Sequence, residues 1–68
     1  MIEFKVEGMS CNHCVQAVTR AVQAIDPVAS VTIDLPSKSV KIGSTHEVAG
    51  LRQAIEAEGY PVIEIRQP

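Results

Sequence analysis

The spacing of hydrophobic positions changes several times along the chain, which predicts a succession of short strands and helices. In the segment Ile2–Val6, apolar residues alternate with charged ones, as in a strand with one buried face. Over residues 14–25 the apolar positions fall three or four residues apart, which predicts an amphipathic helix. We expect this helix to end at Asp26, because the residue before Pro27 is pushed away from helical backbone angles. The apolar stripe expected to face the core is Val15, Val18, Val22 and Ile25.

The second half of the chain repeats this change of period. Alternation over residues 30–35 predicts a strand, residues 36–38 a turn, and the region around Val40 and Ile42 a short strand. Residues 44–47 have the Ser-x-x-Glu form of a capping box, with Ser44 at the N-cap and Glu47 reaching back. A helical stripe follows, Gly59 is expected to end that helix, and residues 62–66 suit a last strand. The stripe consists of Val48, Leu51 and Ile55.

The predicted order is therefore βαββαβ, the split βαβ plan of ferredoxin-like folds. It is an α+β sandwich in which one four-stranded antiparallel sheet carries both helices on a single face. We expect residues 1–68 to form a single domain, because 68 residues suffice for only one thin core. Many functions share this plan, so the fold alone does not decide among them.

Composition excludes several classes of partner. The formal net charge of −2 provides no basic patch for nucleic acid or for an anionic membrane surface. No apolar run approaches the roughly 20 residues of a membrane span. Charged residues interrupt the first apolar run, which argues against a signal peptide. Without an export signal we expect the cytoplasm as the compartment. Met1 directly before the first strand and residues 66–68 directly after the last favour a complete free-standing chain.

Two cysteines, Cys11 and Cys14, carry the candidate chemistry. A disulfide between them would close a tiny loop and restrict the unfolded chain little, so metal binding or redox chemistry is favoured over stabilisation. They lie where the first strand passes into the first helix, and the positive end of a helix favours thiolates, most of all at Cys14. Two soft thiolates suit Cu(I), whereas structural zinc takes four ligands and the chain has no second cysteine pair.

The segment Gly8-Met9-Ser10-Cys11-Asn12-His13-Cys14 resembles the G-M-x-C-x-x-C signature of the heavy-metal-associated domain family. The element order and the Gly59-Tyr60 step are similar as well, and the resemblance extends over essentially the whole chain. Within the family the chain looks most like the CopZ-like bacterial copper chaperones.

The resemblance implies a carrier protein, not an enzyme. It would bind one Cu(I) through Cys11 and Cys14 and deliver the ion to the soluble metal-binding domains of a copper-transporting P-type ATPase. It also permits delivery to a copper-responsive regulator, and it permits a monomer that forms a copper-linked dimer.

Residues near the cysteine pair each have a structural and a functional interpretation. Met9 is a potential thioether ligand, but packing beneath the loop is the favoured interpretation. His13 is a polar loop residue or a modulator that adds a ligand or bridges a dimer. Tyr60 shields the metal site or only packs at the edge of the core. Ser10 stands where zinc and cadmium members often have an acidic residue, and His46 is expected at the surface, in the first turn of the second helix.

Three other functions compete with a copper chaperone. The chain could be a domain of a metal pump, or a carrier of another soft or borderline ion such as mercury, zinc or cadmium. A thiol–disulfide oxidoreductase is the alternative from a different class, because such enzymes also place Cys-x-x-Cys at a helix start. Docking to a partner would use the loop that contains Cys11 and Cys14 and a flank of the first helix that has little net charge. That flank comprises Gln16, Thr19, Arg20 and Gln23.

Overall fold

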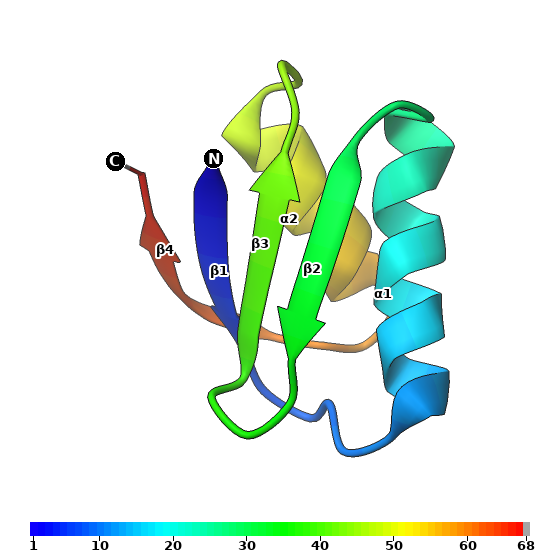
Figure 1. Ribbon diagram of the computed structural model, residues 1–68, viewed down its shortest axis with the longest axis vertical. Coiled ribbons are helices and arrows are strands. Elements are labelled where there is room, and N and C mark those ends of the chain that lie inside the picture. The colour runs from blue at the N-terminus through cyan, green and yellow to red at the C-terminus, as the bar shows by residue number, and fades with distance from the viewer. Residues whose placement is uncertain (68) are drawn as a thin grey trace.

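One antiparallel sheet forms the front layer of the molecule in the computed structural model, which describes residues 1–67 (Figure 1). The strands lie in the order β2-β3-β1-β4, and both helices cover the same face of the sheet. The predicted βαββαβ sandwich is therefore confirmed. In chain order the elements are β1 (Ile2–Val6), α1 (Asn12–Ile25), β2 (Ser30–Asp34), β3 (Ser39–Gly43), α2 (Val48–Ala57) and β4 (Val62–Arg66).

The core lies between the sheet and the two helices. Alternation in β1 directs Phe4 and Val6 inward, and Phe4 stands opposite Val40 of β3 and Ile65 of β4. Four of the seven helix residues that the 3.6-residue period predicted to face the core are fully buried, whereas Val15 and Val48 are only partly buried. The four are Val18 and Val22 from α1 and Leu51 and Ile55 from α2.

Three details of the prediction were wrong. Ile25 does not belong to the core: it is the last residue of α1 and is 39% exposed, because no further helical turn covers it. The capping box does not form, since α2 begins at Val48 with Glu47 at the N-cap and no side-chain capping bond. Ser44 instead donates to the Asp26 carboxylate and accepts the N–H of His46, which ties the β3–α2 loop to the end of α1. The third error concerns His46, which is exposed as expected but precedes α2 instead of lying in its first turn.

Three connections meet at the lower end of the molecule in Figure 1: the β1–α1 loop, the β2–β3 turn and the α2–β4 loop. Backbone hydrogen bonds join them. Val6 N–H donates to the Lys38 carbonyl over 2.9 Å, and Glu7 N–H donates to the Pro61 carbonyl over 2.9 Å. The end of β1 is thus fixed on both sides immediately before the segment that contains the two cysteines.

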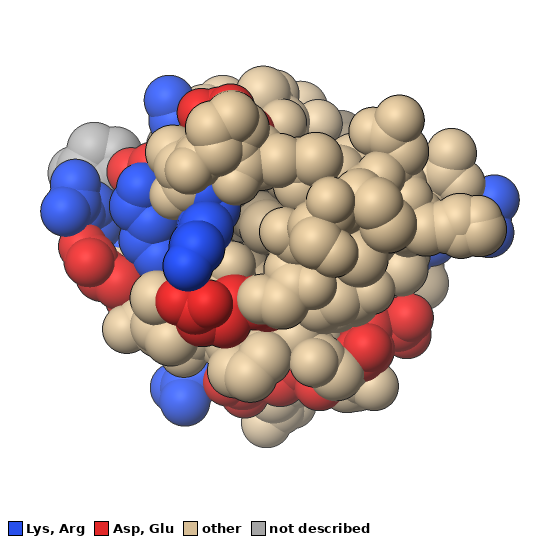
Figure 2. Space-filling view, turned by 90° about the horizontal axis from the view of Figure 1, so that it is seen from below, with Lys and Arg blue, Asp and Glu red and all other residues tan. Residues whose placement is uncertain are grey.

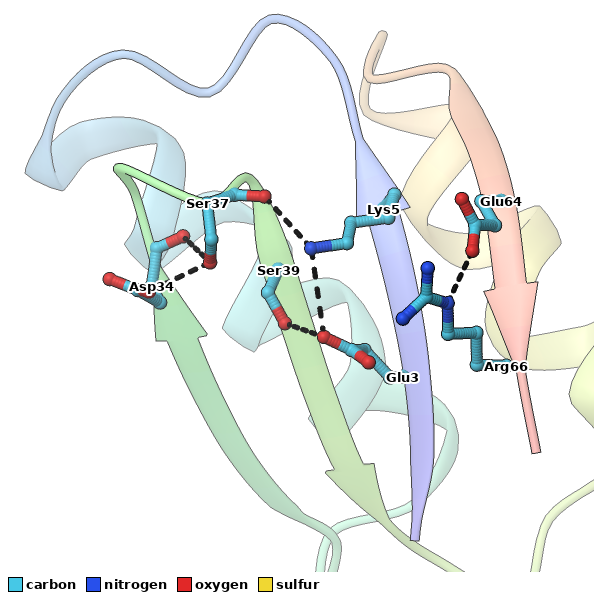
Figure 3. A network of polar contacts seen from close by, with 7 residues as sticks. All are labelled: Glu3, Lys5, Asp34, Ser37, Ser39, Glu64 and Arg66. Carbon is cyan, nitrogen blue, oxygen red and sulfur yellow. Dashed lines mark hydrogen bonds and ion pairs between the residues drawn. The ribbon is translucent and has the colours of Figure 1, made fainter. Parts of the chain in front are cut away.

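The face of the sheet opposite the helices carries a network of charged and hydroxyl side chains (Figure 3). Ser39 Oγ donates to Glu3 Oε2 over 2.6 Å, and Lys5 Nζ lies 3.8 Å from the same oxygen. The Ser39 hydroxyl, with smaller help from nearby cations, holds the pKa of Glu3 below its usual value. Arg66 pairs with Glu64 on β4. The network lets this face of the sheet meet water.

Two further expectations concern the extent of the chain. Neither helix within residues 1–67 is long and apolar enough to cross a membrane. Pro68, part of the expected C-terminal end, lies outside the described residues.

Candidate metal centre

Residues 8–14, called here the metal loop, carry the chain from β1 into α1. Gly8 has a φ of +88°, a left-handed conformation that a side chain would strain, so glycine is suited to the turn away from the sheet. Met9 then turns inward and is 7% exposed within the hydrophobic core. This placement agrees with the packing interpretation of Met9. Because Met9 anchors the loop from below, the following residues are presented at the surface.

The two thiols face each other across the start of α1. Cys11 is exposed, Cys14 is partly buried, and both are free. Their Sγ atoms are 3.7 Å apart, and the Cys14 thiol donates to the Gly8 carbonyl over 3.8 Å. The pair is therefore accessible from one side and bounded by backbone on the other.

Helix geometry explains this arrangement. Cys11 is the N-cap of α1, and its carbonyl accepts the N–H groups of Cys14 (3.1 Å) and Val15 (3.2 Å). Its side chain makes no capping bond, so the sulfur is left free while the backbone starts the helix. Cys14 lies within the first turn, where the positive end of the helix favours a negative side chain.

The environment lowers the pKa of the Cys14 thiol from 9.0 to about 7. The largest cause is the Tyr60 hydroxyl, which hydrogen-bonds the sulfur and favours its thiolate form. The Ser10 backbone and the Cys11 side chain act in the same direction, and partial burial opposes them. The same contact with Cys14 raises the pKa of Tyr60. Cys14 is thus substantially a thiolate near neutral pH.

The α2–β4 loop brings Tyr60 to the metal loop. Gly59 ends α2 as expected, with a φ of +92° and an N–H bonded to the Glu56 carbonyl over 3.0 Å. The Tyr60 ring lies against Gly8, with its Cδ1 3.5 Å from the position that a Cβ on Gly8 would occupy. Tyr60 therefore packs at the core edge and also acts on Cys14, so its two interpretations are compatible.

The remaining candidate residues lie at different distances from this centre. Ser10 is exposed, and its backbone, not its side chain, helps to lower the pKa of Cys14. His13 is exposed on the first turn of α1 and does not join the two cysteines in a cluster of three potential ligands within residues 1–67. His46 lies before α2 and packs over Gly50, with its Nδ1 3.2 Å from the Glu47 carbonyl.

The separation of the sulfurs limits how a metal could bind. With a metal–thiolate bond of about 2.3 Å, the value for zinc, a sulfur separation of 3.7 Å corresponds to an S–metal–S angle of about 107°. Linear coordination would need about 4.6 Å between the sulfurs with the same bond length. Linear coordination would therefore require the two sulfurs to move apart by about 0.9 Å, and Cys11 is the exposed member of the pair.

Sequence reasoning missed two backbone groups of this centre, the Gly8 carbonyl and the Ser10 amide. Backbone groups leave no mark in residue identity. The glycine at position 8 was the only signal in the sequence, because a glycine marks a place where the backbone can turn sharply toward the thiols.

A ferredoxin-like sandwich with two free thiols at its first strand–helix junction defines a class of small metal-binding domains. Comparison with known proteins identifies the family. The model of the heavy-metal-associated domain matches residues 3–61, and the chain belongs to this family.

Individual relatives are similar over most of their length. The copper chaperone CopZ of Staphylococcus aureus is 41% identical over 61 residues, which are 85% of this chain and 90% of that protein. The structure of the copper chaperone Atx1 from Synechocystis superposes with a TM-score of 0.89 at 41% identity, covering 93% of this chain and all of that one. A structure described as the CopZ metallochaperone gives a TM-score of 0.84 at 37% identity, with 93% and 100% covered.

Proposed function

We propose that this chain is a copper chaperone that binds one Cu(I) through Cys11 and Cys14 and passes it by ligand exchange to a metal-binding domain of a copper-transporting P-type ATPase. Two relatives described as copper chaperones, each about 41% identical, support the metal and the carrier role. The thiol pair supports the site. We also propose that residues 1–68 act as a single domain and that the cytoplasm is where the chain works.

The observation that carries the proposal is the incomplete ligand set. Two free thiols lie 3.7 Å apart, one of them exposed, and no cluster of three His, Cys, Asp or Glu side chains forms within residues 1–67. Soft thiolates bind both Cu(I) and zinc, but structural zinc prefers four protein ligands. A two-thiolate site is therefore a better match to Cu(I) than to zinc.

An incomplete shell also accounts for transfer. A two-coordinate ion leaves space for an incoming thiolate, so a three-coordinate intermediate can form before either original bond breaks. Cys11 is the exposed member of the pair and is the sulfur that an acceptor reaches first. Cys14, held by Tyr60 and the loop backbone, is suited to retain the ion until the acceptor has two bonds to it.

Anaerobic titration of the reduced protein with Cu(I), in parallel with Zn²⁺, tests the binding step. We expect one Cu(I) per chain, not displaced by an equal concentration of Zn²⁺. Cys11→Ser and Cys14→Ser should each abolish tight binding while circular dichroism shows a folded chain. Asn12→Ala, an exposed residue between the cysteines that lacks a soft ligand, is the matched control and should bind as the wild type does.

Transfer is tested by mixing the copper-loaded chain with a metal-free soluble domain of a copper-transporting P-type ATPase. The expected result is movement of copper through a short-lived complex, faster than spontaneous release of copper to a chelator of equal affinity. Transfer no faster than that release would contradict the chaperone role. Catalytic reduction of disulfide substrates by the metal-free chain would instead favour an oxidoreductase.

A further inference from the structure

The end of the molecule that presents the thiols is uncharged. Residues 8–19 and 59–63 contain no Asp, Glu, Lys or Arg, although such residues make up 21% of the chain. The β2–β3 turn contributes two more uncharged residues at the same end. We call these exposed positions the metal-end face. They are Gly8, Ser10, Cys11, Asn12, His13, Gln16, Pro36, Ser37, Gly59 and Pro61.

Figure 2 looks onto this end and shows a broad region without charged side chains, with charges gathered at its margins. Glu7 and Lys38 lie beside the loops but compensate each other, with 3.2 Å between Lys38 Nζ and Glu7 Oε1. Glu58 is exposed directly before Gly59 and bounds the second uncharged stretch. Arg20 is exposed on α1 beyond the uncharged stretch.

The contrast with the open face of the sheet shows that this neutrality is local. There, opposite charges alternate across the strands: Glu3 stands opposite Lys41 and Arg66, and Lys5 stands opposite Glu64. Figure 3 shows Lys5 paired with Glu3 and Arg66 paired with Glu64 on this face. Charged residues are thus concentrated away from the surface on which a metal would be exchanged.

Ligand exchange requires an acceptor thiolate to reach a metal held at Cys11, so the acceptor must cover the metal-end face. We propose that the acceptor presents an uncharged surface around its own thiol pair and that charge does not steer the encounter. This inference rests on the proposed chaperone function. An acceptor with charged groups around its thiols would have to desolvate them against a surface that offers no counter-charge, which disfavours that complex.

The charge of the metal site itself does not favour a charged acceptor surface. Two thiolates and one Cu(I) carry a net charge of −1, but the same group passes from donor to acceptor and so belongs to both partners in the complex. Specificity would then come from rejection of charged faces and from close contact of neutral ones. Without steering, association rate constants of about 10⁵–10⁶ M⁻¹ s⁻¹ are expected, compared with up to about 10⁸–10⁹ M⁻¹ s⁻¹ for strongly steered pairs.

The chain itself supplies matched acceptors, because it carries a thiol pair on an uncharged face. Copper-loaded wild-type protein is mixed with isotopically labelled metal-free acceptors, and copper movement is followed by native mass spectrometry after rapid mixing. The acceptors are the wild type, Gln16→Lys and Gln16→Glu. Gln67→Lys and Gln67→Glu are the controls, since Gln67 is exposed after β4, at the end of the sheet remote from the metal loop.

Transfer to the wild-type acceptor should change by less than about twofold between about 0.01 M and about 1 M salt, over which the screening length falls from about 30 Å to about 3 Å. Both Gln16 variants should accept copper several-fold more slowly, and both Gln67 variants at the wild-type rate.

A steep salt dependence, or faster transfer to Gln16→Lys, would overturn the inference while leaving the chaperone function intact. A stable copper-bridged pair that does not turn over would also overturn it, because the occupant of the face would then be a second copy. No transfer in any pair, despite copper binding, would instead refute the proposed function.

Discussion

Replacing Tyr60 with phenylalanine isolates the effect of one hydroxyl on the metal centre. The ring and its packing against Gly8 are kept, and the hydroxyl that acts on Cys14 is lost. With a pKa of about 7, about half of the Cys14 thiols are ionised at pH 7, whereas a thiol at the ordinary 9.0 would be ionised in about one chain in a hundred. Because the Ser10 backbone and Cys11 still act, Tyr60→Phe should place the pKa between these two values.

The assay is the rate at which iodoacetamide alkylates Cys14 as a function of pH, with tandem mass spectrometry separating Cys14 from Cys11. Thiolate is the reacting form, so Tyr60→Phe should slow alkylation near pH 7 and leave it unchanged well above the ordinary thiol pKa. Glu58→Gln removes a charge close to Tyr60 and serves as the control; it should leave the Cys14 profile unchanged. A Tyr60→Phe profile that coincides with that of the wild type would refute the role assigned to the hydroxyl.

Four further predictions concern stability and titration. Leu51→Ala removes a fully buried side chain and should lower the free energy of unfolding by about 2–5 kcal/mol in chemical denaturation. Gly59→Ala meets no atom within 4 Å but requires a left-handed backbone, so it should cost only about 1–2 kcal/mol, and a larger loss would contradict the structure there. Ser39→Ala should raise the pKa of Glu3, followed by NMR titration of its side chain, because the largest cause of the lowering is lost. The lowered pKa of Cys14 means that the unfolded chain binds more protons between about pH 7 and pH 9, so the metal-free protein should become more stable as the pH rises through that window.

The hydrophobic pattern was sufficient to predict the fold. Each strand and helix buries one face in the core, and this burial sets the spacing of its apolar residues. Phe4 and Leu51 illustrate this: both were placed correctly by spacing alone and both are fully buried. The pattern failed where a helix ends. Ile25 continued the apolar stripe of α1 in the sequence, but the helix ends at this residue and its side chain is exposed.

The errors around α2 have a different cause. Ser44 and Glu47 have the residue types of a capping box, yet Ser44 bonds to Asp26, a residue 18 positions earlier in the chain. Tertiary contacts of this kind are not encoded in a local motif. The same limit applied to the backbone groups of the metal loop. The approach of Tyr60 to Cys14 also depends on the meeting of two loops, and it was expected from the family resemblance and not from a local motif.

X-ray absorption at the copper edge, on the anaerobically loaded chain, reports which atoms hold the copper. A site made by Cys11 and Cys14 predicts one Cu(I) per chain with two sulfur neighbours and no nitrogen, and the same spectrum for His13→Ala. A shell of four ligands, or a nitrogen neighbour that disappears in His13→Ala, would contradict a site formed by the two thiolates alone.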